Sequence, residues 1–209
     1  MNAITRSGLL LLLGASAARA QTVTIGVHGA LGDYRETSSD LRFKGLGGGF
    51  DLTLNWRWLR ADASGTSVKY DSTAGSAFQS FTSKEAKVHV GYAFTPSLIG
   101  EVGFVHRSID PKFTAQEMSA IPIGLRYQAV LGPGAGIGLR GDYLAAASFS
   151  GGGSAGLAVE LGLFFWAGPA NGRFRFTGDY SFQRLDRETG GLKTPIQESL
   201  GKLGVAVGF

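Results

Sequence analysis

The stretch "LGKLGVAVGF" (residues 200–209) alternates between large apolar side chains and small or polar ones. The large apolar residues occupy every second position, at Leu203, Val205, Val207 and Phe209. Because successive side chains of a β-strand point to opposite faces, these residues share one face, and Lys202 and the small residues share the other. The stretch therefore predicts a β-strand with one apolar face that continues to the final aromatic residue.

The same period of two recurs along the chain. Ten strands are predicted, at about residues 23–31, 46–56, 58–70, 85–94, 98–104, 121–128, 137–143, 157–165, 174–182 and 202–209. The segment 58–70 is the weakest, because its alternation changes phase near Gly65, which predicts a β-bulge. If this segment and one neighbour do not span, the alternative is eight strands.

Short turns alternate with longer polar loops between these strands. The turns fall at about 56–58, 95–97, 132–134 and 168–172, and most contain Pro or Gly. The loops fall at about 32–44, 71–83, 108–117, 148–154 and 185–198. This layout is typical of an all-β, closed, antiparallel, up-and-down transmembrane β-barrel. Strands of about ten residues, tilted by about 40°, would rise about 25 Å and match the apolar band of such barrels.

The composition favours a membrane barrel over a soluble one. Hydrophobic residues make up 44% of the chain, yet no apolar run is long enough for a membrane-spanning helix. In a soluble barrel the apolar face would fill the interior, and these large side chains exceed the volume of a small interior. Aromatic belts at both membrane interfaces are also predicted. The belt near the turns comprises Trp56, Trp58, Tyr92, Phe94, Tyr127, Phe165, Trp166 and Phe209, and the belt near the loops comprises Tyr34, Phe43, Tyr70, Tyr143, Tyr180 and Phe182.

Residues 1–20 have the features of a secretory signal peptide. A basic residue, Arg6, precedes a short leucine run, and Ala18-Arg19-Ala20 forms a cleavage site. We therefore expect a cleaved signal peptide at 1–20 and one barrel domain at 21–209. Cleavage would leave 18 basic residues against 16 acidic ones, which does not indicate nucleic-acid binding. The chain has no cysteine, so packing and hydrogen bonds must stabilise it without disulfides.

The leader, the order of strands, turns and loops, and the terminal Phe209 together resemble small outer-membrane β-barrels of Gram-negative bacteria, of the OmpA, OmpX and OmpW type. The resemblance implies an outer-membrane location with both termini in the periplasm, and contact with outer-membrane lipid and lipopolysaccharide. It also implies that the barrel-assembly machinery reads the C-terminal pattern of Leu203, Val205, Val207 and Phe209. The type is functionally diverse, so the resemblance indicates location more than activity.

The alternation directs seven cations and seven carboxylates into the lumen. They are Arg60, Lys87, Arg107, Arg126, Arg140, Arg175 and Lys202 with Asp51, Asp62, Glu85, Glu101, Asp142, Glu160 and Asp179. Unpaired charge is costly in a narrow interior, so this balance predicts a paired network that plugs the lumen. The alternative is a narrow porin-like conduit, with the inward glycines opening space. The plug predicts a structural or surface-interaction role, in which the outer loops could bind partners.

An enzymatic alternative rests on "HRSID" (residues 106–110). His106 and Ser108 share the lipid-facing side of a strand end, and Asp110 or Glu117 could orient the histidine. This arrangement is similar to that of lipid A deacylases and would make the protein a lipid A-modifying hydrolase. A three-residue motif without further context is weak, so we expect a polar strand end and no enzyme. No metal ligand set and no cofactor are indicated.

Overall fold

The computed structural model describes residues 21–38, 41–73, 80–112, 117–169 and 172–209. The predicted signal peptide, residues 1–20, lies outside them. The strands are β1 (Gln21–Glu36), β2 (Leu41–Trp56), β3 (Leu59–Ser72), β4 (Phe81–Ala93), β5 (Leu98–Asp110), β6 (Met118–Gly132), β7 (Ala135–Phe149), β8 (Ser154–Ala167), β9 (Phe174–Thr189) and β10 (Leu192–Gly208). Among the described residues, no helix is long and apolar enough to cross a membrane.

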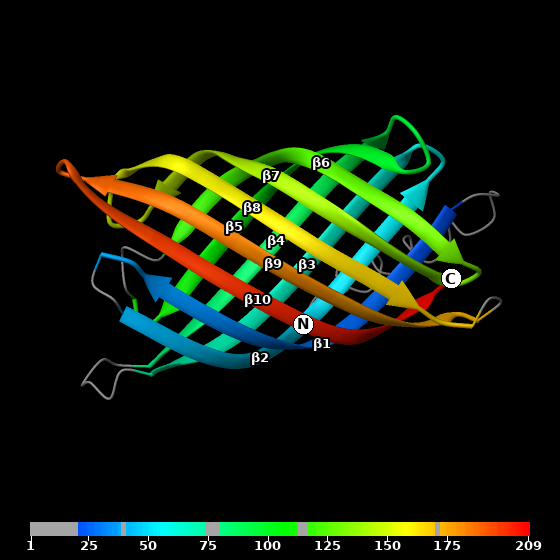
Figure 1. Cartoon of the computed structure of the whole chain (residues 1–209), viewed down its shortest axis with the longest axis horizontal. Coiled ribbons are helices and arrows are strands. Elements are labelled where there is room, and N and C mark those ends of the chain that lie inside the picture. The colour runs from blue at the N-terminus through cyan, green and yellow to red at the C-terminus, as the bar shows by residue number, and fades with distance from the viewer. Residues whose placement is uncertain (1–20, 39–40, 74–79, 113–116, 170–171) are drawn as a thin grey trace, which may run out of the picture.

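The ten strands form one closed barrel (Figure 1). Each strand pairs antiparallel with its neighbours in sequence, and β10 returns to β1 with Val205 opposite Val27. Backbone hydrogen bonds join Phe209 and Val23 at the last position of this seam. The predicted ten-stranded, up-and-down barrel is therefore confirmed, and the alternative of eight strands is wrong.

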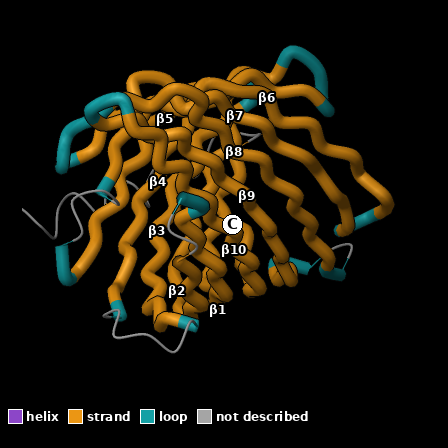
Figure 2. The backbone as a smooth tube through the Cα atoms, turned by 60° about the vertical axis from the view of Figure 1, so that its left-hand side comes forward, coloured by secondary structure: helices purple, strands orange, loops and turns teal. Residues whose placement is uncertain are grey.

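The strands are longer than the predicted ten residues. They contain 13 to 17 residues, because much of the polar sequence assigned to loops continues as paired strand (Figure 2). The clearest case is the predicted loop 185–198, which contains only a two-residue turn at Gly190 and Gly191. Both glycines have positive φ, at 57° and 80°, which suits a tight hairpin. We call this end of the barrel the loop end. The opposite end, which has the short turns, the start of β1 and the end of β10, is called the turn end.

The bulge predicted near Gly65 is wrong. The pairing of β3 with both β2 and β4 runs without a register shift, and Gly65 lies on the outer wall beside the ring of Phe50. Register shifts occur instead between β6 and β7 and between β8 and β9. The apparent change of phase arises because Val68 and Tyr70 are apolar residues that point into the barrel. Because the interior is apolar at this end of the barrel, the inward positions of β3 become apolar and the outward ones polar, without any bulge.

The interior of the loop end is packed with apolar side chains, which we call the loop-end plug. Its buried members include Tyr34, Phe43, Val68, Tyr70, Phe81, Val105, Ile109, Met118, Leu144, Phe149, Leu185 and Ile196. Tyr34, Phe43 and Tyr70 are predicted from the sequence to lie in the outer belt near the loops. That prediction is wrong, because all three side chains are buried inside the barrel. Large rings placed inward at this end fill the interior and exclude water from it.

The outer wall carries exposed apolar side chains over most of its height. Every strand except β3 contributes at least one, such as Ile25, Phe50, Val88, Phe104, Ile123, Leu139, Leu161, Phe176 and Leu203. Toward the loop end the outward positions become charged, as at Asp33, Lys44 and Lys69. A contiguous apolar surface of this kind is not stable in water and requires an apolar environment around the barrel.

Replacing Phe81 or Phe104 by alanine removes the same ring from opposite faces of the wall. The ring of Phe81 contacts three other rings of the plug, with centroid distances of 5.0 to 5.5 Å. We expect Phe81→Ala to lower the free energy of unfolding by about 3–5 kcal/mol, as for other buried aromatic residues. Phe104→Ala, on the exposed outer wall, should cost much less. Denaturant unfolding in detergent micelles measures both, and equal losses would contradict the assignment of Phe81 to a packed plug.

Candidate functional site

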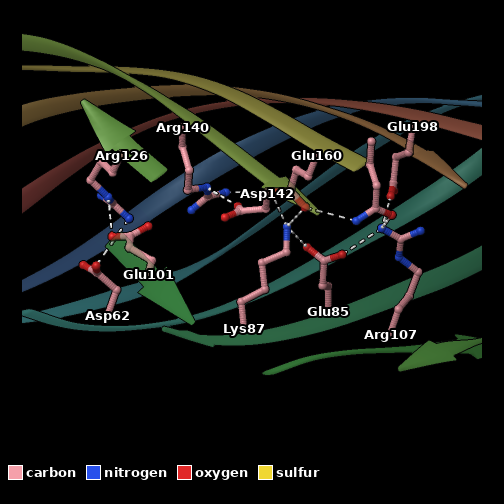
Figure 3. Close-up of polar contacts among 11 residues, drawn as sticks. Asp62, Glu85, Lys87, Glu101, Arg107, Arg126, Arg140, Asp142, Glu160 and Glu198 are labelled. Carbon is pink, nitrogen blue, oxygen red and sulfur yellow. Dashed lines mark hydrogen bonds and ion pairs between the residues drawn. The ribbon is translucent and has the colours of Figure 1, made fainter. Parts of the chain in front are cut away.

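The middle of the lumen contains a network of ion pairs below the loop-end plug (Figure 3). It is built by inward positions of six strands, and we call it the central network. Its members are Glu85, Lys87, Arg107, Arg140, Asp142, Glu160, Gln183 and Glu198. All of these side chains are largely buried, so their charges are compensated by one another and not by bulk water.

Glu160 lies at the centre of this network. Its carboxylate accepts hydrogen bonds from Lys87 Nζ at 2.7 and 2.8 Å, from Arg140 Nη2 at 2.6 Å and from Gln183 Nε2 at 3.0 Å. Lys87 belongs to β4 and Glu160 to β8, which are four strands apart in the ring of ten. This contact therefore crosses the lumen and does not follow the wall.

Arg107 makes a second crossing. Its Nη2 donates to Glu85 Oε2 and to Gln183 Oε1, at 2.7 and 2.8 Å, and also pairs with Glu198. Glu198 on β10 is diametrically opposite Arg107 on β5. The carboxylate of Glu198 also accepts a hydrogen bond from the hydroxyl group of Tyr70, with an oxygen–oxygen distance of 2.6 Å. The central network is thus joined directly to the loop-end plug.

A smaller cluster of charges lies closer to the turn end. Arg126 donates to Glu101 at 2.7 Å and lies 3.3 Å from Asp62, which also accepts two hydrogen bonds from Arg60 at 2.7 and 2.9 Å. Thr53 donates to the same Asp62 carboxylate at 2.6 Å. These contacts order the guanidinium groups along one side of the lumen.

The structure brings most of the predicted lumen charges together. Asp51 lies apart from them and shares a hydrogen bond of 2.6 Å with His28, whose other ring nitrogen is 3.1 Å from Thr66 Oγ1. Within the described residues, the remaining three charges lie outside these ion pairs and line a cavity at the turn end, namely Arg175, Asp179 and Lys202.

Sequence reasoning missed Gln183, Glu198 and Tyr70 as partners in the lumen. Each of the three lies an even number of residues from an inward residue already identified on its strand, so it has the same parity and points into the lumen. The predicted strand 174–182 stops short of Gln183, and the polar composition of 185–198 predicts a loop at Glu198. The apparent change of phase near Gly65 directs Tyr70 outward. Extending the parity through these segments would have found them.

The turn end of the lumen holds a cavity of about 560 Å³, which we call the vestibule. Its floor is formed by Lys87 and Arg140 of the central network together with His89, and its rim includes Asn55 and Arg175. The vestibule opens at the turn end, and the central network and the plug close it at its inner end. Its described walls come from strands on all sides of the barrel.

Trp166 lines the vestibule together with Phe164. The prediction that Trp166 belongs to an outer aromatic belt is therefore wrong, whereas Trp56, Trp58 and Phe165 do lie exposed on the outer wall. The error follows from assigning aromatics by their distance from a turn, although Trp166 has inward parity on β8.

The residues of the enzymatic alternative do not form the hydrogen-bonded arrangement that it requires. His106 is exposed on the outer wall, and its Nδ1 lies 2.9 Å from Ser119 Oγ on the neighbouring strand. Neither Ser108 nor Glu117 forms a side-chain hydrogen bond to His106 in the described part of the chain. The described residues also contain no group of three or more His, Cys, Asp or Glu side chains that could hold a metal ion.

Comparison with known proteins identifies the fold. No family model and no curated protein sequence matches the chain. Among solved structures, the outer-membrane protease OmpT from Escherichia coli superposes with a TM-score of 0.56 at 8% identity, covering 92% of this chain and 98% of OmpT. Neisserial surface protein A matches with a TM-score of 0.42 at 12% identity, covering 88% and 96% of the two chains. The chain thus has the fold of an outer-membrane β-barrel, and at this identity the likeness says nothing of its activity.

Glu160→Gln tests whether the central network is a closed unit. The variant removes the negative charge that Lys87 and Arg140 share. These cations keep Glu85 and Asp142 as partners, but the buried network gains one uncompensated positive charge, which costs about 3–5 kcal/mol of unfolding free energy.

Arg184→Gln is the control, because the pair of Arg184 with Asp186 is on the outer side of β9 and exposed to solvent. We expect the free energy of unfolding of Arg184→Gln, measured by denaturant unfolding, to equal that of the wild type. A stable Glu160→Gln variant would contradict a tightly coupled network.

Proposed function

We propose that the chain is an integral protein of the bacterial outer membrane, with a closed lumen and a structural or surface-interaction role. In this arrangement the apolar outer wall is in contact with lipid, and the turn end with both termini faces the periplasm. The loop end then faces outward. The contiguous exposed apolar side chains and the fold shared with OmpT support this placement.

The observation that carries the closed lumen is the set of contacts across it. Lys87 with Glu160, and Arg107 with Glu198, join opposite walls through buried side chains. Above them, Tyr34, Tyr70 and Phe81 are at most 2% exposed and occupy the barrel axis region of the loop end. A hydrated ion would have to displace paired charges and then a packed apolar layer, and both steps are costly.

The outer wall near the loop end supports contact with lipopolysaccharide. Lys44 and Lys69 point outward there, next to the exposed apolar residues Leu31 and Leu46. They border a groove of about 740 Å³ that Asp33 and Asp71 also line. Cationic side chains at the boundary of an apolar band are suited to the phosphate groups of an anionic lipid headgroup. We propose outer-membrane lipid and lipopolysaccharide as the partners of this surface.

Planar bilayer recording tests the closed lumen. Wild-type protein, purified with its native fold verified by heat-modifiable migration on gels, should insert without producing discrete conductance steps. The expected result follows from the ion pairs that cross the lumen. A stable and reproducible conductance would overturn the closed lumen in favour of the narrow conduit.

Phe209→Ala tests the proposed recognition of the C-terminal strand by the barrel-assembly machinery. The Phe209 backbone closes the seam through its hydrogen bonds to Val23, whereas its side chain is 66% exposed. The variant should therefore refold in detergent micelles as the wild type does, but yield less folded barrel in the outer membrane of expressing cells. Phe176→Ala is the matched control, because Phe176 is an aromatic residue of the same exposure on the neighbouring strand. Equal yields of folded barrel for the two variants would contradict the proposal that the assembly machinery recognises Phe209.

A further inference from the structure

The vestibule has the dimensions of a ligand site. Its volume of about 560 Å³ lies within the range of about 300–1,000 Å³ that is typical of small-molecule pockets. The pocket is concave, accessible from the turn end and closed at the floor by Lys87, His89 and Arg140. A closed lumen alone does not require this space, since side chains could have filled it as they fill the loop end.

An aromatic shelf forms one side of the vestibule. Phe164 and Trp166 are inward neighbours on β8, and their rings are nearly parallel, with a centroid distance of 6.1 Å and an interplanar angle of 19°. The adjacent strand β7 has Gly136 and Gly138 opposite them, and a Cβ atom at either glycine would collide with these rings. The sequence therefore makes room for two aromatic rings inside a polar lumen, at a position away from the loop-end plug.

Cations dominate the charged surface of the vestibule. The charged side chains that line it are Arg60, Lys87, Arg126, Arg140, Arg175 and Lys202 on the positive side and Asp51, Asp62 and Asp179 on the negative side. The carboxylates that compensate the deeper cations, such as Glu101 and Glu160, do not line the cavity. The lumen as a whole is balanced, but its open end presents mainly positive groups to a ligand.

One buried polar atom on the floor has no partner. His89 is 4% exposed and lines the vestibule, yet its Nε2 forms no hydrogen bond within the described residues. Buried polar atoms are nearly always hydrogen-bonded, so an unpartnered one at the floor of an open cavity indicates a position for a ligand atom. This observation is independent of the charge and of the aromatic shelf.

We propose that the vestibule binds a small organic anion with a planar, apolar body, of which an aromatic carboxylate is the simplest example. The planar body stacks on Trp166, because the guanidinium of Arg126 already lies over the Phe164 ring, 5.1 Å from its centroid. The carboxylate is held by the cations outside the ion pairs, Arg175 and Lys202. A cationic ligand would be repelled by the same groups, and an inorganic anion would leave the aromatic shelf unused.

Fluorescence titration of the full barrel in detergent micelles tests the site. The chain has three tryptophans, and replacing the two on the outer wall, by Trp56→Phe and Trp58→Phe, leaves Trp166 as the only one. We expect benzoate to change Trp166 emission in a saturable manner. Benzyl alcohol, which is neutral, should bind more weakly, and benzylamine, which is cationic, should bind weakest. Absence of saturable binding, or equal binding of the three probes, would overturn the proposal.

Two double variants, measured by calorimetry, separate the site from general charge attraction. Arg175→Gln with Lys202→Gln should weaken benzoate binding by about ten-fold or more, the effect of losing a charge-assisted hydrogen bond. Lys84→Gln with Arg184→Gln removes the same net charge from exposed positions of the outer wall and should leave benzoate binding unchanged. If both pairs weaken binding equally, the attraction is nonspecific and the site is rejected. These results do not depend on whether the lumen conducts.

Discussion

The structure depends on one constraint, which is that the backbone of its first and last strands must be paired with each other. An open sheet edge in lipid would leave a row of N–H and C=O groups without partners, at a cost of several kcal/mol for each group. The pairing of β1 with β10, ending in the mutual hydrogen bonds of Val23 and Phe209, removes that edge. Once the sheet is closed, each strand has one face outside and one face inside, and the alternation of the sequence becomes a division between two environments.

Closure also determines how charge is handled inside. Inward polar side chains cannot reach bulk water through the wall, so each buried charge must find its partner within the lumen. In a ring of ten strands the opposite wall is close enough for Lys87 to reach Glu160 and for Arg107 to reach Glu198. The narrow interior thus turns charge pairing into a set of ties across the barrel, and the same ties obstruct passage along its axis.

Parity explains both how much of the fold could be predicted and where prediction failed. The number of strands, their order and their closure follow from the period of two, which is a local property. Composition alone misplaces the ends of the strands. Glu198 falls in the predicted loop 185–198, and Gln183 falls just beyond the predicted end of its strand at residue 182. Tyr34 and Trp166 were assigned to outer belts for the same reason, although both have inward parity. Pairs such as Lys87 with Glu160 are separated by 73 residues, and only the three-dimensional stagger of the strands brings them together.

The glycines of the lumen connect these observations. In a narrow barrel an inward glycine either opens a channel or provides room for a neighbouring side chain, and the sequence alone does not distinguish the two. In this structure the ring of Tyr70 lies against Gly32 and Gly45 in the plug, and the rings of Phe164 and Trp166 lie against Gly138 and Gly136 in the vestibule. At these four positions the glycines provide room for large inward rings. Other inward glycines, such as Gly47, Gly49 and Gly103, lie against backbone carbonyl groups of the adjacent strand. The vestibule persists because its large side chains are stacked on one side of the wall, whereas those of the plug converge from several strands.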